Sequence, residues 1–177
     1  LEMLSSFSLG PLSPYDTDDS CENLLLHRIR SVWSMEGRVE TRPLEDLQIE
    51  PSWVGHGVRA ERFGQVGSLP VNGYFPFIGL EDIKTGLVWG AQLAHNASWQ
   101  MEAFRPGPWL YLDGGLADQE MGHWKKQIAP GEKFTTPEAI LTVSKGSPIE
   151  QYGDTPSEAF NDMCQRLTSD LIDAADQ

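Results

Sequence analysis

Four carboxylates lie close together in the sequence, at Glu102, Asp113, Asp118 and Glu120. Most glycosidases cleave the bond between two sugars with a pair of such groups, one acting as acid and the other as nucleophile or base. Asp113 and Glu120 are the pair that a self-contained hydrolase would use. The chain has 26 acidic residues, however, and the ordinary place of such residues is in turns or on a solvated face. Their separation in space decides between these roles.

The sequence shows no metal-binding pattern, and serine, histidine and acidic residues occur throughout it without a motif that marks a catalytic triad. The histidines have no short ligand spacing, and Cys21 and Cys164 lie far apart with no CxxC pair. We therefore expect neither a metal nor a cofactor, and we expect the histidines to be structural or solvated. No GxSxG, P-loop or GxGxxG motif occurs. The histidines are His27, His56, His95 and His123.

Tryptophan is the residue type that could bind a sugar here, because its ring stacks on the apolar face of a sugar and also packs well in a core. We expect Trp89 and Trp99 in the core. Trp53 lies in a glycine-rich loop, where packing and surface contact remain equally open. The chain has six tryptophans: Trp33, Trp53, Trp89, Trp99, Trp109 and Trp124.

Size and charge restrict the class of protein. The 177 residues with 40 % hydrophobic content predict one globular domain. The formal net charge of −13 argues against nucleic acid and anionic membranes as partners, because both require a basic patch. No signal peptide and no long apolar run is present, which favours the cytoplasm over secretion. Because the first residue is Leu1 rather than Met, we expect a fragment or a processed piece.

Apolar and polar residues alternate along much of the chain, as is typical of β-strands. The 17 glycines and 12 prolines are spread as single turn signals, and strand patterns recur about every ten residues, the spacing of a β-sandwich. Within 35–50, Pro43 indicates an edge strand or a bend. The sequence therefore predicts an all-β antiparallel sandwich, with strands in 1–9, 24–33, 35–50, 74–80, 109–112, 123–128 and 133–143.

The segment 85–105 is predicted to form a central β-hairpin. Its apolar residues fall on every second position of two limbs, 87–93 and 99–103. A loop of odd length places Leu93 opposite Met101 and Ala91 opposite Ala103, so that both apolar sets share one face. We therefore expect a loop of about three or five residues around 95–98.

The pattern changes to a helical one at Thr155. The run Thr155-Pro156-Ser157-Glu158 is a capping box with proline at the first helical position. The apolar residues that follow fall on one helical face: Phe160, Met163, Cys164, Leu167 and Leu171. This predicts one C-terminal amphipathic helix, and hence a sandwich over 1–153 and a connector helix over 154–177.

Five segments, in order, resemble glycoside hydrolase family 36, the α-galactosidases. VWGAQLAHNASWQMEAFR is similar to the family's hairpin with WG, SGNW and a following glutamate, and APGEKFTTPEAILTV to its PGE-F-TPE-VL segment. SLPVNGYFPFIGLED resembles its Ser-His-Asn-Pro-Phe-Phe block, with Asn72-Gly73-Tyr74 as a departure. The two remaining segments are LLLHRIRSVWSMEGRVE and FSLGPLSPY.

The resemblance implies the last portion of the N-terminal β-supersandwich domain, whose relatives include galactose mutarotase. In the family, the nucleophile and the acid/base are two aspartates on a (β/α)8 barrel. Such a barrel needs about 250 residues, so no catalytic residue is carried over to this chain. The implied parent enzyme is a retaining α-galactosidase that acts on terminal α-D-galactosides, and α-N-acetylgalactosaminidase activity stays open.

Three functions follow from these patterns. The first is a non-catalytic accessory domain that packs against the barrel, shapes the pocket entrance through Trp53 and Asn72, and supports a homo-oligomer. The second is a stand-alone carbohydrate-binding module that recognises galactosides through an exposed Trp53. The third is the self-contained hydrolase with Asp113 and Glu120. We also expect the isolated chain to self-associate through an unpaired sheet edge.

Overall fold

A computed structural model describes most of the chain. The described residues are 4–12, 23–49, 60–69, 71–106, 109–123, 125–145, 164, 165 and 169. The strands are β1 (Leu4–Leu12), β2 (Leu24–Ile29), β3 (Val39–Pro43), β4 (Ala60–Gln65), β5 (Phe77–Asp82), β6 (Leu87–Ala94), β7 (Trp99–Phe104), β8 (Leu110–Leu116) and β9 (Glu138–Lys145). Two short helices accompany them, the 3-10 helix η1 (Glu45–Leu47) and α1 (Gln119–Gly122).

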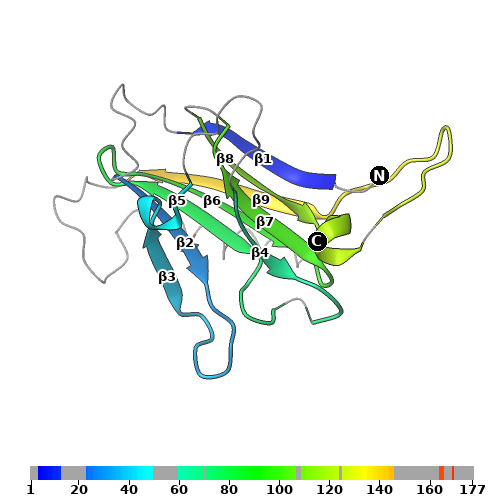
Figure 1. The fold of residues 1–177 in the computed structure, drawn as a ribbon, viewed down its shortest axis with the longest axis horizontal. Helices are drawn as coiled ribbons and strands as arrows, with labels where there is room; N and C mark the ends of the chain where they lie inside the picture. The colour runs from blue at the N-terminus through cyan, green and yellow to red at the C-terminus, as the bar shows by residue number, and fades with distance from the viewer. Residues whose placement is uncertain are drawn as a thin grey trace.

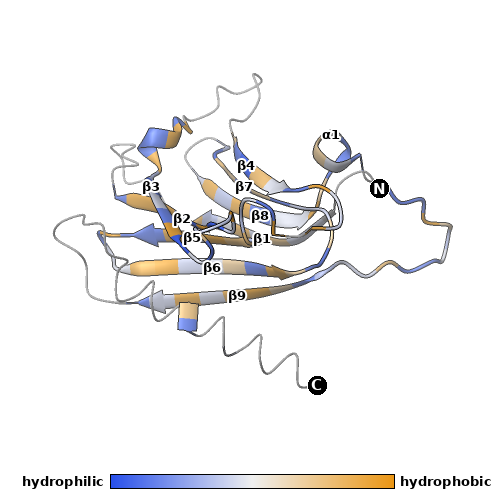
Figure 2. Ribbon diagram, turned by 90° about the horizontal axis from the view of Figure 1, so that it is seen from below, coloured by the Kyte–Doolittle hydropathy of each residue, from blue (hydrophilic) through white to orange (hydrophobic). Residues whose placement is uncertain are grey.

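The strands form two antiparallel sheets. One sheet has four strands in the order β1-β8-β7-β4, and the other has five in the order β3-β2-β5-β6-β9. The sheets lie face to face, with the long extended segment after α1 reaching away from one end (Figures 1 and 2). This confirms the predicted all-β sandwich, and β3 with its Pro43 is an edge strand as expected.

One hydrophobic core fills the space between the sheets. Alternation along each strand sends one set of side chains inward, so Leu26 and Leu80 of the five-stranded sheet pack in the same cluster as Met101 of the four-stranded sheet. Trp99 is fully buried, and Trp89 packs against the cluster from a partly buried position. Both tryptophans therefore lie in the core, as the sequence predicts.

The prediction of a central hairpin is wrong about which strands pair, but it is right about which side chains face the core. β6 pairs with β5 and β9, whereas β7 pairs with β4 and β8, so the two strands belong to different sheets. The loop 95–98 crosses from one sheet to the other. Ala91 and Leu93 still share a core cluster with Met101 and Ala103, because two strands that face each other across a sandwich also bury one face each.

Three strand predictions were inaccurate. β4 lies in a glycine-rich stretch that showed no alternation. β8 continues through Gly114 and Gly115, where the sequence predicted that it ends. No strand forms in the described part of 123–128. Glycine is therefore a poor stop signal in this sandwich, since a large neighbour can occupy the space above it.

The outer face of the five-stranded sheet is also covered in part. Phe77 and Val88 form a second buried cluster, against which Ile140 and Cys164 pack. Burial raises the pKa of the Cys164 thiol to about 11, so this thiol stays protonated at neutral pH.

The structure describes only three residues of the predicted C-terminal helix, 164, 165 and 169, and all three are helical. No described helix is longer than α1. The helix stays a prediction.

No helix among the described residues is long and apolar enough to cross a membrane.

Candidate functional site

Of the two residues predicted to contact a substrate, the structure describes only Asn72. Trp53 lies outside the described residues. Asn72 is exposed in the turn that precedes β5, beside the loop that connects β2 and β3. The turn and the loop are joined by a hydrogen bond in which the Ser31 backbone N–H donates to the Gly73 carbonyl at 3.0 Å. The neighbouring Trp33 is 90 % exposed, a surface position that the sequence did not predict.

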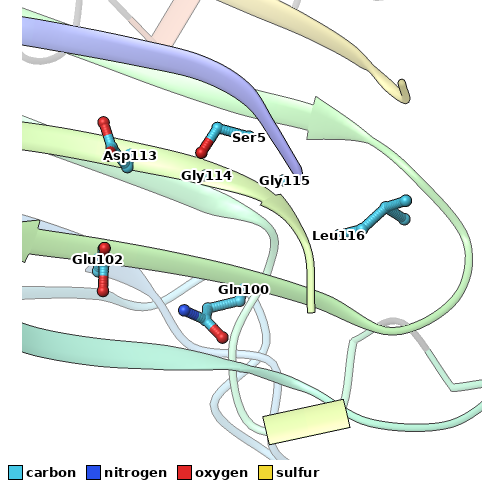
Figure 3. A pocket seen from close by; sticks show the side chains of 7 residues that line it. All are labelled: Ser5, Gln100, Glu102, Asp113, Gly114, Gly115 and Leu116. Atoms are coloured by element: carbon cyan, nitrogen blue, oxygen red, sulfur yellow. The ribbon is translucent and has the colours of Figure 1, made fainter. Parts of the chain in front are cut away.

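The carboxylates are brought together on the outer face of the four-stranded sheet. Ser8, Asp113, Glu102 and Arg62 are successive cross-strand partners on β1, β8, β7 and β4. Arg62 donates from Nε to the Glu102 carboxylate at 2.5 Å. Figure 3 shows Asp113 and Glu102 on neighbouring strands. Two of the four carboxylates therefore lie side by side. They are Glu102 and Asp113, whereas the pair named for a hydrolase was Asp113 and Glu120.

A cavity of about 10 Å³ lies between these two carboxylates, lined also by Ser5, Gln100 and Gly114–Leu116 (Figure 3). Gln100 Oε1 and Asp113 Oδ1 are buried there without a hydrogen-bond partner. Burial raises the pKa of Asp113, against the opposing hydrogen bond from Ser8. A volume of this size admits about one water molecule but not a sugar ring.

The other two carboxylates have different positions. Asp118 is the N-cap of α1, and its carboxylate accepts a hydrogen bond from the Met121 backbone N–H at 2.6 Å. This is the ordinary structural use of an aspartate at that position. Glu120 belongs to α1, but its side chain lies outside the described part of the structure. The pair of Asp113 and Glu120 therefore stays a prediction.

A charged network joins the two sheets at another end of the core. Arg28 of β2 is 6 % exposed and donates to Glu61 of β4 at 2.6 Å and to Glu40 of β3 at 2.5 Å. Its guanidinium carbon also lies 5.0 Å from the centroid of the Tyr74 ring. Arg30 donates to the other oxygen of Glu40. Each charge has an opposite partner, so the network is structural and links the sheets.

The pKa values in this network follow from those contacts. Burial alone would lower the pKa of Arg28 and raise that of Glu40. The hydrogen bonds and charges that the partners supply reverse both effects, so the pKa of Arg28 is raised and that of Glu40 is lowered. Burial raises the pKa of Tyr74. All of these groups therefore keep their usual charge at neutral pH.

A buried histidine bridges three strands on the outer face of the five-stranded sheet. His27 Nε2 lies 3.0 Å from Glu81 Oε2, and its Nδ1 lies 2.9 Å from Thr41 Oγ1. His27 and Glu81 are 1 % and 2 % exposed. The polar groups are matched to each other within the sheet, which gives His27 a structural position. Among the described residues no three His, Cys, Asp or Glu side chains gather in a metal-binding group.

A larger pocket, of about 540 Å³, lies where the loop 95–98 meets the extended segment 125–137. Sequence reasoning did not predict it, although it joins the two segments that most resemble a known family, the end of β6 and the PGE-F-TPE run. Burial lowers the pKa of His95 in its wall. The residues that line it are His95, Ala97, Ser98, Leu116, Lys126, Phe134, Thr135, Thr136 and Pro137.

Comparison with solved structures shows a similarity to part of an enzyme. The chain resembles the galactosidase domain of alpha-galactosidase-sucrose kinase, AgaSK, with a TM-score of 0.54 and 25 % sequence identity. The match covers 70 % of this chain but only 16 % of that chain, so this chain spans a small part of the protein it resembles. No protein-family model matches the sequence, and no curated protein matches it. The chain is therefore a β-sandwich that resembles part of an α-galactosidase domain.

Proposed function

We propose that this chain is a non-catalytic accessory sandwich of a retaining α-galactosidase of glycoside hydrolase family 36. The observation that carries this proposal is the match to the galactosidase domain of AgaSK, which extends over 70 % of the chain at 25 % identity. The order of the five family-like segments adds support from the sequence. The catalytic barrel of such an enzyme would lie on polypeptide outside these 177 residues.

The role that we assign to the chain is structural support of a catalytic domain. The sandwich packs against the barrel, shapes the entrance of the substrate pocket and supports a homo-oligomer. Asn72, exposed beside the Trp33 loop, and Trp53 are the residues that we assign to the pocket entrance. The cavity between Glu102 and Asp113 supports a non-catalytic role, because about 10 Å³ leaves no room for a substrate next to these two acids.

A carbohydrate-binding module is the second candidate function. The sequence suggested Trp53 for this role. The observation that favours it is the pocket beside the loop 95–98, whose volume lies in the range of small-molecule sites. The two functions are compatible, since an accessory domain can hold part of a saccharide while a barrel cleaves it.

Hydrolysis assays test the accessory role. The purified chain is expected to show no turnover of p-nitrophenyl α-D-galactopyranoside. A chimera in which this chain replaces its counterpart in the galactosidase domain of AgaSK should hydrolyse the same substrate, and deletion of that counterpart should abolish activity. Turnover by the chain alone, lost in Asp113→Asn or Glu102→Gln, would establish a self-contained hydrolase instead. A folded but inactive chimera would also contradict the proposal.

A further inference from the structure

The pocket beside the loop 95–98 has the size and placement of a ligand site. Its volume of about 540 Å³ falls within the roughly 300–1,000 Å³ of known small-molecule pockets. Its walls come from the loop 95–98, the end of β8 and the segment after α1, and Figure 1 shows this last segment extending away from the sheets. The cavity between Glu102 and Asp113, by contrast, holds about 10 Å³.

The walls of this pocket are divided between two kinds of group. The hydrogen-bonding side chains are His95, Ser98, Lys126, Thr135 and Thr136, and the apolar ones are Ala97, Leu116, Phe134 and Pro137. A pyranose ring has the same division, with apolar C–H groups on its faces and hydroxyl groups around its edge. An aromatic ring such as Phe134 and hydroxyl side chains are the groups that recognise those two parts.

The charge of the pocket favours a neutral ligand. None of the described residues that line it is acidic, although the chain has 26 acids, so hydroxyl groups of a ligand meet no carboxylate from this part of the chain. Burial lowers the pKa of His95, which leaves the imidazole uncharged at neutral pH, with one donor and one acceptor. Lys126 is the one cation among the lining residues that the structure describes, and its Nζ lies 5.9 Å from the centroid of the Phe134 ring.

Three hydrogen bonds stabilise the two segments that carry the walls. The Ser98 hydroxyl accepts a hydrogen bond from the Gly67 backbone N–H at 2.8 Å, which ties the loop 95–98 to the end of β4. The turn of the extended segment is closed by Glu132, whose carboxylate accepts from the Ala129 backbone N–H at 3.0 Å. Its own N–H donates to the Ala129 carbonyl at 3.0 Å. Such preformed walls reduce the entropy lost on binding.

We propose that this pocket binds one neutral pyranose unit, with Phe134 against the apolar face of the ring and Ser98, Thr135 and Thr136 on its hydroxyl groups. The site goes beyond the accessory role proposed above, because it needs no residue of a catalytic barrel. Asn72 is not among the residues that line it.

Amide chemical shifts of the ¹⁵N-labelled chain test this site. Titration with methyl α-D-galactopyranoside is expected to shift resonances of 95–98 and 134–137 with a Kd of about 1 to 10 mM. The double variant Thr135→Val with Thr136→Val removes two hydroxyl groups at nearly constant shape and should weaken binding at least about fivefold. Thr142→Val is the matched control, because Thr142 lies half-buried on β9 away from the lining residues and should leave the Kd unchanged.

Three outcomes would overturn the proposal. The first is the absence of any saturable shift, and the second is a set of shifts that maps outside the pocket, for example around Asn72. The third is preferential binding of galacturonate, weakened in Lys126→Met, which would show an anion site. Each outcome leaves the accessory role standing, since that role is tested by hydrolysis of an aryl galactoside and by the chimera.

Discussion

Glu102 and Asp113 are adjacent carboxylates on one sheet face, yet they have opposite electrostatic surroundings. Glu102 is 6 % exposed and accepts a charge-assisted hydrogen bond from Arg62. Asp113 has a buried oxygen without a partner, and burial raises its pKa. A carboxylate therefore stabilises the fold at one position and, when it is ionised, destabilises it at the neighbouring one. This contrast argues for a structural rather than catalytic pair, and it can be measured.

Asp113→Asn is expected to raise the stability of the chain at neutral pH. A raised folded-state pKa means that stability falls as pH rises from the unfolded-state value through the folded one, and asparagine removes that loss while keeping an acceptor for Ser8. Urea unfolding should show a higher midpoint for the variant at pH 7 and a smaller difference near pH 3. Glu102→Gln is the paired control and should lose about 1–2 kcal/mol at pH 7. Equal effects of the two variants would contradict this account.

Glu40 should affect the pH dependence of stability in the opposite direction to Asp113, so that stability falls as the pH is lowered. Arg30 and Arg28 lower its pKa, so its contribution is present above the ordinary glutamate value of about 4.3 and is lost as pH falls through the folded-state value. Glu40→Gln should therefore cost about 2 kcal/mol at pH 7 and little at the acid end of a pH series of urea unfolding curves. Glu45→Gln changes an exposed carboxylate and should have almost no effect at any pH. A pH-independent loss in Glu40→Gln would refute the assignment.

At the scale of whole strands, the sequence predicted which face of a strand is buried better than it predicted which strands pair. The alternation over 87–93 and 99–103 correctly indicated two buried faces, because a period of two is a local property of each strand. The same alternation fits a hairpin and a crossing between sheets, so it could not show that β6 and β7 lie in opposite sheets. For the same reason it could not predict a pocket at loop 95–98, since the segment 125–137 reaches that loop only through the tertiary fold.

Glycine within β8 is a second place where local reasoning failed. A Cβ on Gly114 would lie 2.5 Å from Cε1 of Phe7 and 3.0 Å from Cγ of Met101. Phe7 is the cross-strand partner of Gly114 on β1, so the aromatic ring occupies the space that a side chain would take. The glycine is therefore part of the packing between β1 and β8 rather than a strand terminator.

This packing predicts a compensating pair of substitutions. Gly114→Ala should destabilise the fold by about 1–3 kcal/mol through overpacking against the Phe7 ring. Phe7→Leu should destabilise it on its own through lost buried area, but it should also relieve the clash. The double variant should therefore be more stable than the sum of the single effects by about 1 kcal/mol in urea unfolding. Additive effects would show that the ring and the glycine are not coupled.

At the scale of the whole molecule, β9 is an edge strand of the five-stranded sheet that the described residues form. Its residues Leu141 and Val143 pair with Ala91 and Trp89, whose side chains face the core, yet they are 47 % and 52 % exposed. Apolar residues on the core side of an unpaired edge strand favour addition of another strand. The net charge of −13 opposes association at low salt and less so when salt screens it.

We therefore expect the chain to self-associate through β9, and more strongly at high salt. Val143→Lys places a charge on the exposed edge and should shift sedimentation velocity profiles toward monomer at every concentration. Leu69→Lys is the matched control, because Leu69 is 67 % exposed in the loop after β4 and the substitution changes the net charge by the same amount. If Leu69→Lys dissociates the chain equally, net charge rather than the β9 edge controls association. A monomer at high concentration and high salt would instead mean that the half-exposed face of β9 is tolerated in solution without a partner.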